Sequence, residues 1–211
     1  SLAGAEALQA RGVSVQLGPH RPDQFTSADL IVLSPGVPLA QPAIAQARTV
    51  GVPIIGELEL ASRWLKGRIV AITGTKGKST TTTLTARMLA AGGFHAPAGG
   101  NIGAALSAQV EESTADTIHV IESSSFQLET IDTFHPWIAV LVNLSADHID
   151  RHGTFDSYAA AKARIFENQT ATDWAVVNAD DPASLALASH TRARRFDFAL
   201  DAPVADGVTV E

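Results

Sequence analysis

The sequence contains no cysteine, which excludes a disulfide framework, a thiolate nucleophile and a zinc site built on cysteine. It also lacks an apolar run long enough to span a membrane, and no signal peptide opens it. Since the lack of cysteine fits a reducing compartment, we expect a cytoplasmic protein without a membrane span.

Basic residues are also few: the formal net charge is −7, and no basic stripe is visible along the chain. That balance argues against a protein that binds duplex nucleic acid, so we expect no nucleic-acid partner. Apolar residues make up 45% of the sequence and charged residues 18%, which is typical of a folded globular protein. The 211 residues suffice for one good core, or for one domain and part of another. We expect a monomer and, because the chain opens with Ser1, a fragment of a longer protein.

The first part of the chain alternates between helical and apolar extended patterns. The pattern predicts a helix that ends at Gly12, a helix over Ala40–Thr49, and strands at Val13–Leu17, Leu30–Leu33 and Pro53–Ile55. Solid apolar runs between helices are typical of parallel strands that are buried on both faces. The segment is too short for a whole domain, so we interpret residues 1–66 as the C-terminal part of a Rossmann-like N-terminal domain.

A helix predicted over Glu57–Leu65 leads into a second domain, residues 67–211. Apolar strands alternate there with helices, which predicts an α/β fold with a doubly wound, mostly parallel sheet. In such sheets ligands bind beyond the carboxyl ends of the strands. The pattern predicts strands at 69–73, 94–97, 117–122, 137–143, 174–178, 194–198 and 208–210, and helices at 79–91, 154–168 and 181–189.

A glycine loop, Gly74-Thr75-Lys76-Gly77-Lys78-Ser79, follows the first strand of this domain and precedes its first helix. Glycines let backbone N–H groups approach an anion, and the helix N-terminus adds the positive end of its dipole, so the loop predicts a phosphate site. Lys78 would reach the terminal phosphates, and Ser79 or Thr80 would offer a hydroxyl to magnesium. The loop is a shortened variant, because Ile72 stands where the full motif has glycine. The alternative is a simple turn between strand and helix.

Two further strands end in side chains that suit a metal site. Glu122 closes one strand, and the segment that follows the next strand contains His148. A carboxylate and a histidine beside a phosphate site suggest a divalent metal that neutralises phosphate charge. Because magnesium prefers oxygen ligands, the histidine leaves room for Mn²⁺, or for a role outside direct coordination. Taken singly, Glu122 could also cap a turn, and His148 could be a hydrogen-bonded loop residue.

Asn101 and Lys162 are two more candidates. Asn101 sits in the glycine turn Gly99–Gly103, which brings backbone and an amide close to a ligand or simply turns the chain. Lys162 follows Tyr158 by one helical turn and has alanines around it. It is either a surface lysine or a lysine held near the suggested metal site, where desolvation favours the neutral and reactive amine. The residues alone leave both choices open.

At these positions the chain resembles the Mur ligase family of peptidoglycan synthesis. The resemblance covers essentially the whole chain, and its most discriminating part is the segment after Glu122, which is similar to the branch that adds D-glutamate. The matching motifs are Ser34-Pro35-Gly36-Val37, Ile72–Thr80, Gly99-Gly100-Asn101-Ile102-Gly103, Glu122-Ser123-Ser124-Ser125-Phe126-Gln127-Leu128-Glu129, Asp147-His148-Ile149-Asp150-Arg151-His152 and Ala160–Ile165.

The resemblance implies an ATP-dependent amide-bond ligase that joins D-glutamate to UDP-N-acetylmuramoyl-L-alanine through an acyl phosphate. Residues 1–66 would then belong to a nucleotide-sugar-binding domain and 67–211 to an incomplete P-loop-type central domain, with the glutamate-binding domain absent. Alternatives are a related ligase that adds L-glutamate or another amino acid, a P-loop phosphotransferase or nucleotide-binding module, and a catalytically inactive fragment.

The resemblance also implies a role for each matching residue. Gly74, Thr75, Lys76, Gly77, Lys78, Ser79 and Thr80 would bind ATP, and Ser79, Glu122 and His148 would serve Mg²⁺. Asn101 and Ser124 would contact the muramoyl-alanine substrate, with Ser34 and Gly36 near the nucleotide-sugar. Lys162 would be a carbamylated lysine that helps to bind a second metal ion. Lys78, Glu122, His148 and Lys162 would be catalytic. Two residues depart from the family pattern: Lys76 replaces an asparagine, and Ser123 an apolar residue.

Overall fold

The computed structural model describes residues 2–201 and 204–209, and they form two compact units. One unit comprises residues 1–31 and 38–53, and the other comprises residues 32–37 and 54–211. The predicted domain boundary near residue 66 stays a prediction, because compact units of contact need not coincide with the domains of a longer protein.

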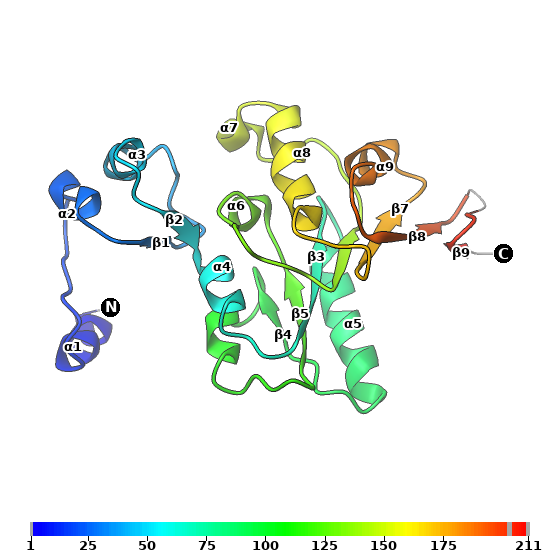
Figure 1. Ribbon diagram of the computed structural model, residues 1–211, viewed down its shortest axis with the longest axis horizontal. Helices are drawn as coiled ribbons and strands as arrows, with labels where there is room; N and C mark the ends of the chain where they lie inside the picture. Colours follow the sequence, from blue (N-terminus) through cyan, green and yellow to red (C-terminus); the bar gives the residue numbers. More distant parts are fainter. Residues whose placement is uncertain (1, 202–203, 210–211) are drawn as a thin grey trace. The chain divides into compact units, whose positions relative to one another are not determined.

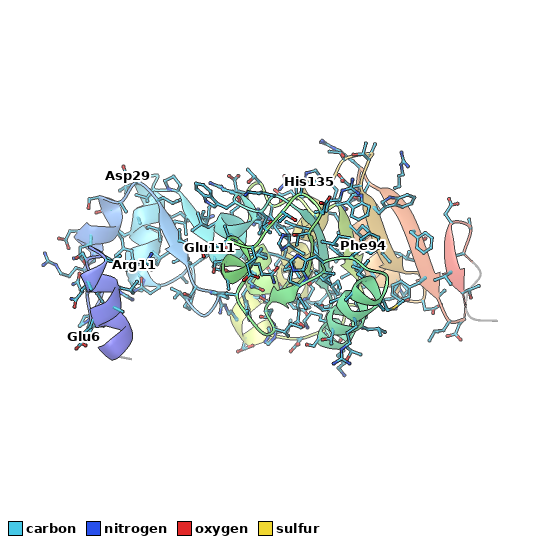
Figure 2. The ribbon with its side chains drawn as sticks, turned by 90° about the horizontal axis from the view of Figure 1, so that it is seen from below. Glu6, Arg11, Asp29, Phe94, Glu111 and His135 are labelled. Atoms are coloured by element: carbon cyan, nitrogen blue, oxygen red, sulfur yellow. The ribbon has the colours of Figure 1, made fainter. Side chains whose placement is uncertain are left out.

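The smaller unit is helical and includes α1 (Leu2–Ala10), α2 (Pro22–Thr26) and α3 (Pro42–Thr49). Both α2 and α3 begin with proline, whose fixed φ suits the first helical turn, and α2 packs against α3. Its charged side chains, among them those of Glu6, Arg11 and Asp29, are exposed (Figure 2).

One predicted strand is wrong. Residues 13–17 have no regular secondary structure and join no ladder of the described chain, and the side chains of Val13 and Leu17 are exposed. An apolar segment becomes a strand only where a neighbouring strand supplies hydrogen bonds, and this segment pairs with no described strand. The predicted strand at 30–33 is β1 (Ile31–Leu33), which pairs with β2 (Ile54–Gly56) in a two-stranded sheet.

The larger unit is built on a seven-stranded sheet in the order β4-β5-β3-β6-β7-β8-β9, and each neighbouring pair in it is parallel. This confirms the predicted α/β fold with a mostly parallel sheet. Within this sheet the chain starts at β3, crosses to the edge strand β4, returns to β5 between β4 and β3, and then continues on the other side of β3 with β6. The strands are β3 (Arg68–Thr73), β4 (Ala98–Gly100), β5 (Ile118–Glu122), β6 (Ile138–Leu141), β7 (Trp174–Asn178), β8 (Arg194–Ala199) and β9 (Gly207–Thr209).

Helices cover both faces of this sheet, as a doubly wound fold requires (Figure 1). On one face α5 (Lys78–Ala91) packs its Ala86 on Val70, Ile72 and Val120. The other face packs against α4 (Glu57–Ser62), η1 (Leu106–Gln109), α6 (Ser125–Leu128), η2 (Arg164–Phe166) and α9 (Pro182–Ala188). The helix α8 (Phe155–Ala163) reaches the end of β3, where Lys162 Nζ donates to Thr73 Oγ1 at 3.3 Å. No helix of the described residues is both long and apolar enough to cross a bilayer.

Several predicted bounds shift. The short strand expected at 94–97 is β4, because the ladder of β5 pairs Ala98 with Val120. The helix expected over 154–168 is shorter: α8 ends at Ala163, and the 3₁₀ helix η2 follows it directly. The strand expected at 208–210 is β9, and position 210 lies outside the described residues. Two short helices, α6 and α7 (Ile149–His152), follow β5 and β6 where no helix was predicted.

A buried carboxylate anchors the loop that follows α6. Glu59 in α4 is fully buried and accepts hydrogen bonds from the backbone N–H groups of Asp132, Thr133 and Phe134 and from Nε of Arg63. Burial alone would raise the pKa of Glu59, but the hydrogen bonds from Asp132, from the backbone and hydroxyl of Thr133 and from Arg63 outweigh it and hold the pKa below its ordinary value.

Candidate active site

The glycine loop is held in shape by Asn143, which follows β6. The backbone N–H of Thr75 donates to the carbonyl of Asn143 at 3.0 Å, and that of Lys76 donates to Asn143 Oδ1 at 2.9 Å. In return Asn143 Nδ2 donates to the carbonyl of Lys76. Gly77 has a φ of 81°, and a Cβ at Gly74 would lie 3.2 Å from the carbonyl oxygen of Asn143, so both positions need glycine.

The backbone N–H groups that a phosphate could reach lie in the first turn of α5, directly after the glycine loop. Because Asn143 occupies the N–H groups of Thr75 and Lys76, a phosphate would meet those of the first helical turn, which lack intrahelical acceptors. Lys78 lies in the same turn, and its Nζ donates to the carbonyl of Thr75 at 2.9 Å. The Lys76 side chain is exposed, and Thr80 lines a shallow surface groove with Ser79, Thr83, Leu84 and Arg87.

Glu122 brings three predicted residues together from three elements. Its Oε2 accepts a hydrogen bond from Ser79 Oγ at 2.6 Å, and its Oε1 accepts one from Asn101 Nδ2 at 2.7 Å. Glu122 closes β5, Ser79 belongs to α5, and Asn101 follows β4. The side chain does not cap a turn of its own segment, so that alternative is wrong. Because neighbouring parallel strands end at one edge of the sheet, the contact follows from the topology.

Lys162 is buried, with 2% of its surface exposed, so it is not a surface lysine. Its Nζ donates to the carbonyl of Gly74 at 2.7 Å and to Thr73 Oγ1 at 3.3 Å. Burial, and secondly the charge of Lys78, lower the pKa of Lys162 to about 7, although two nearby carboxylates act in the opposite direction. A large share of neutral amine therefore exists near neutral pH.

Tyr158, one turn before Lys162, connects α8 to the phosphate loop. Its hydroxyl lies 2.9 Å from Thr75 Oγ1, and Lys162 Nζ lies 4.9 Å from the centre of its ring. Thr75 Oγ1 also bonds to the backbone N–H and carbonyl of Ser145. The Thr75 side chain thus joins the loop to α8.

His148 has a left-handed backbone, with φ 51° and ψ 31°. Its Nε2 lies 3.6 Å from Asp147 Oδ2, and its ring centre lies 5.1 Å from that of Phe126. Within the described part of the chain these are its side-chain contacts, so the structure does not join His148 to Glu122. A left-handed non-glycine residue stores strain, a feature that clusters at functional sites.

A cavity of about 270 Å³ collects most of these residues. Four of its lining residues were not among the predicted site residues: Ser125, Phe126, Asp147 and Tyr158. Ser125, Phe126 and Asp147 lie inside motifs that the sequence shares with the family, and Tyr158 precedes Lys162 by one helical turn, but no pattern singled them out as site residues. The lining comprises Lys78, Asn101, Ser124, Ser125, Phe126, Asp147, His148, Tyr158 and Lys162.

Ser34 and Gly36 do not line this cavity. They belong to the exposed turn after β1, where the N–H of Val37 donates to the carbonyl of Ser34. The turn is joined to α7, because Nη2 of Arg151 donates to the carbonyl of Pro35 at 3.2 Å.

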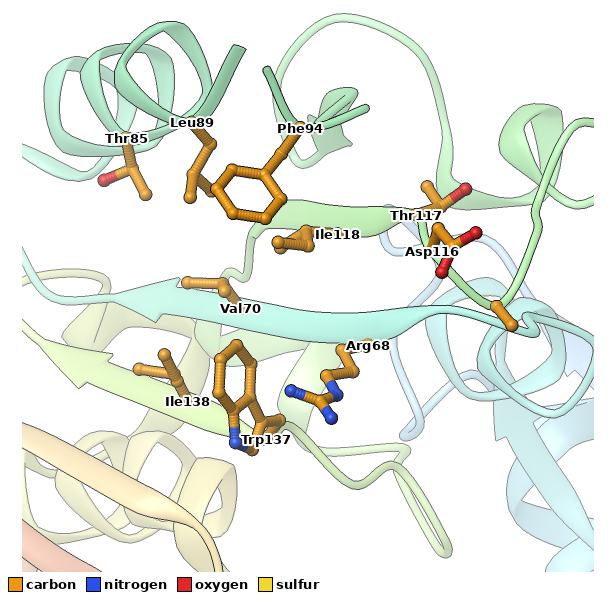
Figure 3. A pocket seen from close by; sticks show the side chains of 11 residues that line it. Arg68, Val70, Thr85, Leu89, Phe94, Asp116, Thr117, Ile118, Trp137 and Ile138 are labelled. Carbon is orange, nitrogen blue, oxygen red and sulfur yellow. The ribbon is translucent and has the colours of Figure 1, made fainter. Parts of the chain in front are cut away.

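A larger hollow of about 790 Å³ lies at the other end of the strands, where Arg68, Ile118 and Ile138 open β3, β5 and β6 (Figure 3). Apolar side chains such as Phe94 and Trp137 converge there. Ligands of parallel sheets bind at the carboxyl ends, and the hollow is far along the strands from Glu122, so we do not assign the chemistry to it.

The residues present fit a phosphate–magnesium pair. Ser79 and Glu122 supply a hydroxyl and a carboxylate, the oxygen ligands that magnesium prefers. The described residues contain no group of three or more His, Asp or Glu side chains that could hold a metal by themselves. A magnesium ion here would therefore take its other ligands from phosphate oxygens and water, as it usually does in nucleotide sites.

Comparison with known proteins agrees with this geometry. Residues 72–208 match the Mur ligase middle domain, and residues 1–56 match the N-terminal domain described as Mur ligase MurD-like. The chain belongs to the Mur ligase family. It is 46% identical over 203 residues to the UDP-N-acetylmuramoylalanine–D-glutamate ligase of Koribacter versatilis, and 48% identical over 204 residues to that of Acidobacterium capsulatum. These alignments cover 96% and 97% of the chain but only 45% and 44% of the relatives, so the chain spans less than half of their length.

Solved Mur ligases share the fold at lower identity. A UDP-N-acetylmuramoyl-L-alanyl-D-glutamate–2,6-diaminopimelate ligase superposes with a TM-score of 0.56 at 24% identity, covering 86% of this chain and 48% of its own. A UDP-N-acetylmuramate:L-alanyl-γ-D-glutamyl-meso-diaminopimelate ligase from Neisseria meningitides superposes with a TM-score of 0.60 at 19% identity, covering 92% and 65%. At these identities the likeness supports the fold alone.

Proposed function

We propose that the protein that carries this chain is an ATP-dependent ligase that joins D-glutamate to UDP-N-acetylmuramoyl-L-alanine. The observation that carries the proposal is the contact of Glu122 with both Ser79 and Asn101. It places a carboxylate between the phosphate loop and a second glycine turn, beside the cavity. The named D-glutamate ligases among the relatives support the choice of amino acid.

In this function the reaction has two steps. The alanine carboxylate of the substrate attacks the terminal phosphorus of ATP and becomes an acyl phosphate as ADP leaves. The neutral amine of D-glutamate then attacks the acyl carbon and gives up a proton, and the tetrahedral intermediate loses phosphate to leave an amide. Catalysis consists mostly of bringing several anionic oxygens close together, and cations and backbone dipoles stabilise their negative charge.

The chain supplies these cations and dipoles from fixed positions. The start of α5 and Lys78 would hold the phosphates of ATP, and Asn101 and Ser124 would orient the muramoyl-alanine end in the cavity. Bound magnesium, for which manganese is the alternative, would screen phosphate charge and polarise the acyl phosphate. Ser79 and Glu122 would hold it, and His148 would serve it from the cavity wall, while Ser34 and Gly36 would face the nucleotide-sugar.

We further propose that Lys162 is carbamylated. Its neutral amine, present near pH 7, would attack CO₂ and lose a proton, which forms a carbamate with a new carboxylate. That carboxylate would be a further anionic oxygen ligand in the cavity and would help to bind a second metal ion. We also propose that the protein acts as a monomer in the cytoplasm.

The test is an assay of the full-length protein with ATP, UDP-N-acetylmuramoyl-L-alanine and either D- or L-glutamate, with the product identified by mass. We expect amide product with D-glutamate only. Product with L-glutamate only would favour the related ligase. Phosphate release that does not depend on the muramoyl substrate would favour a phosphotransferase or nucleotide switch.

A further inference from the structure

Three side chains form a line behind one wall of the cavity. The imidazole of His152, in α7, lies between Ser125 and Glu129: its Nε2 is 2.9 Å from Ser125 Oγ, and its Nδ1 is 3.0 Å from Glu129 Oε1. The side chain of His152 is 2% exposed, whereas Ser125 lines the cavity. The proposed function uses none of the three.

The partners of His152 decide which of its nitrogens carries the proton. The Glu129 carboxylate, 3.0 Å from Nδ1, repels a nitrogen lone pair and stabilises a ring proton there, so the neutral ring carries its proton on Nδ1. Burial lowers the pKa of His152, although the charge of Glu129 acts in the opposite direction, and in the neutral ring Nε2 is an acceptor. The hydroxyl of Ser125 then donates to Nε2 and leaves its oxygen lone pairs for the cavity.

Aromatic contacts fix this orientation. The ring of His152 stacks on Phe126, with centres 5.2 Å apart and planes at 9°, and meets the ring of Tyr158 edge-on at 5.4 Å. The guanidinium of Arg151 lies 3.9 Å from the centre of the Phe126 ring. Since Phe126 and Tyr158 also line the cavity, the imidazole cannot turn without moving the wall.

The polar groups on the cavity wall divide into donors and acceptors of hydrogen bonds. Lys78 and Lys162 supply donors, and the hydroxyl of Ser124 already donates to Gln127 Oε1 and accepts from its backbone N–H. The acceptors on the wall include the carboxylate of Asp147, Oδ1 of Asn101, whose Nδ2 bonds to Glu122, and Oγ of Ser125. Both substrates of a muramoyl-alanine ligase bring N–H groups, namely the amide of the alanine and the amine of the incoming amino acid.

We propose that Ser125 is a substrate-binding residue that accepts a hydrogen bond from a substrate N–H group, and that His152 and Glu129 are positioning residues that orient its hydroxyl. The proposal rests on the proposed ligase function for the identity of the substrate, but the orientation of the hydroxyl does not depend on it. Its two parts therefore need separate measurements.

The first measurement uses the 211-residue chain itself and needs no activity. Long-range ¹H–¹⁵N spectra of the histidine rings, with His152→Phe to assign the signals, report which nitrogen is protonated. We expect His152 as the Nδ1–H tautomer. The Nε2–H tautomer would overturn the proposal, because the ring would then donate to Ser125 and free the hydroxyl proton to point elsewhere.

The second measurement uses steady-state kinetics of the full-length protein, with KM determined separately for the amino acid and for the nucleotide-sugar. Ser125→Ala removes the acceptor, and His152→Phe keeps the ring stack on Phe126 but removes both nitrogens. We expect each variant to raise one KM by about two- to tenfold, the range of a single hydrogen bond. A raised KM for the amino acid indicates its amine as the donor, and a raised KM for the nucleotide-sugar indicates the alanine amide.

Three comparisons separate positioning from general damage. The double variant should be no worse than Ser125→Ala, because both changes remove one interaction. His152→Gln, whose amide oxygen can accept from Ser125, should restore part of the KM, and Ser189→Ala on an exposed helix end should change nothing. Additive effects, or unchanged KM values in both single variants, would overturn the proposal. If the wild-type protein forms no amide at all, the proposed function fails while the tautomer result stands.

Discussion

Ser79 and Glu122 are 43 positions apart in the sequence, yet Ser79 Oγ donates to Glu122 Oε2 at 2.6 Å. The contact exists because β3 and β5 are neighbouring parallel strands that end at the same edge, with the phosphate loop and α5 directly after β3. The Ser79 hydroxyl in the first turn of α5 is thus joined to the Glu122 carboxylate. This pair of oxygen groups suits a magnesium ion that bridges protein and phosphate.

Glu122→Gln should weaken the binding of Mg·ATP and abolish most ligase activity. The amide keeps the shape and one acceptor but removes the charge that holds the metal, and a hydrogen bond to a charged group contributes about 1.5–3 kcal/mol. We therefore expect the Kd for Mg·ATP to rise about tenfold or more, measured by calorimetry. Glu111→Gln, a change at an exposed position, is the matched control. An unchanged Kd in Glu122→Gln would contradict the metal role.

A second prediction concerns His119, which is fully buried between Gln109 and Ser113. Its Nδ1 donates to Gln109 Oε1, and its Nε2 accepts from the Ser113 hydroxyl, whose oxygen already accepts from Lys66 N–H. Both partners suit the neutral ring. Burial, and secondly the charge of His95, lower the pKa of His119 to about 4.

The unfolded chain therefore binds a proton at His119 that the folded chain does not, in the window between about pH 6.5 and pH 4. Stability from this residue is complete above pH 6.5 and is lost as the pH falls through that window, by about 3 kcal/mol in total. Urea unfolding at several pH values should show a steeper acid loss in the wild type than in His119→Gln. His190→Gln, at an exposed position, should follow the wild type. Equal slopes in all three proteins would contradict the assignment.

Much of the fold was predictable because buried parallel strands leave solid apolar runs, and the glycine loop and its carboxylate were predictable because strand ends meet at one edge. Residues 13–17 show the limit: their pattern suits a strand, but pairing depends on a neighbour that local sequence does not reveal. His152 shows the same limit for the site. Its role depends on Ser125 and Glu129, 27 and 23 positions earlier in the chain, and a histidine in a short helix carries no signal of that contact.

Asn143 is the clearest residue that sequence reasoning missed, and it leads to a third prediction. Asn143→Ala removes the side-chain bonds to the backbone N–H groups of Thr75 and Lys76 and to the carbonyl of Lys76. Each such bond contributes about 0.5–1.5 kcal/mol. We expect the loop to lose its preformed shape, the Kd for ATP to rise about tenfold and the urea midpoint to fall.

Asn143→Asp is the graded control for this prediction, since its carboxylate still accepts from both N–H groups but no longer donates to Lys76. Its Kd for ATP should lie between those of the wild type and Asn143→Ala. If Asn143→Ala binds ATP as the wild type does, other contacts hold the loop in its binding shape, and the Asn143 side chain is not what preforms the phosphate site.

The carbamate on Lys162 is the subject of the last prediction. Incubation of the protein with ¹³C-bicarbonate should produce a carbamate signal in the ¹³C spectrum that grows from pH 6 to pH 8, because the pKa of about 7 sets the share of neutral amine. The signal should be absent from Lys162→Ala and present in Lys76→Ala, which removes an exposed lysine of the same loop region. In the full-length protein Lys162→Ala should lose activity, and a short carboxylate such as acetate should restore part of it by occupying the vacated space. A Lys162→Ala protein with wild-type activity, or one that no carboxylate rescues, would contradict the carbamate role, because a lysine that acts only through its burial would not be replaced by an anion.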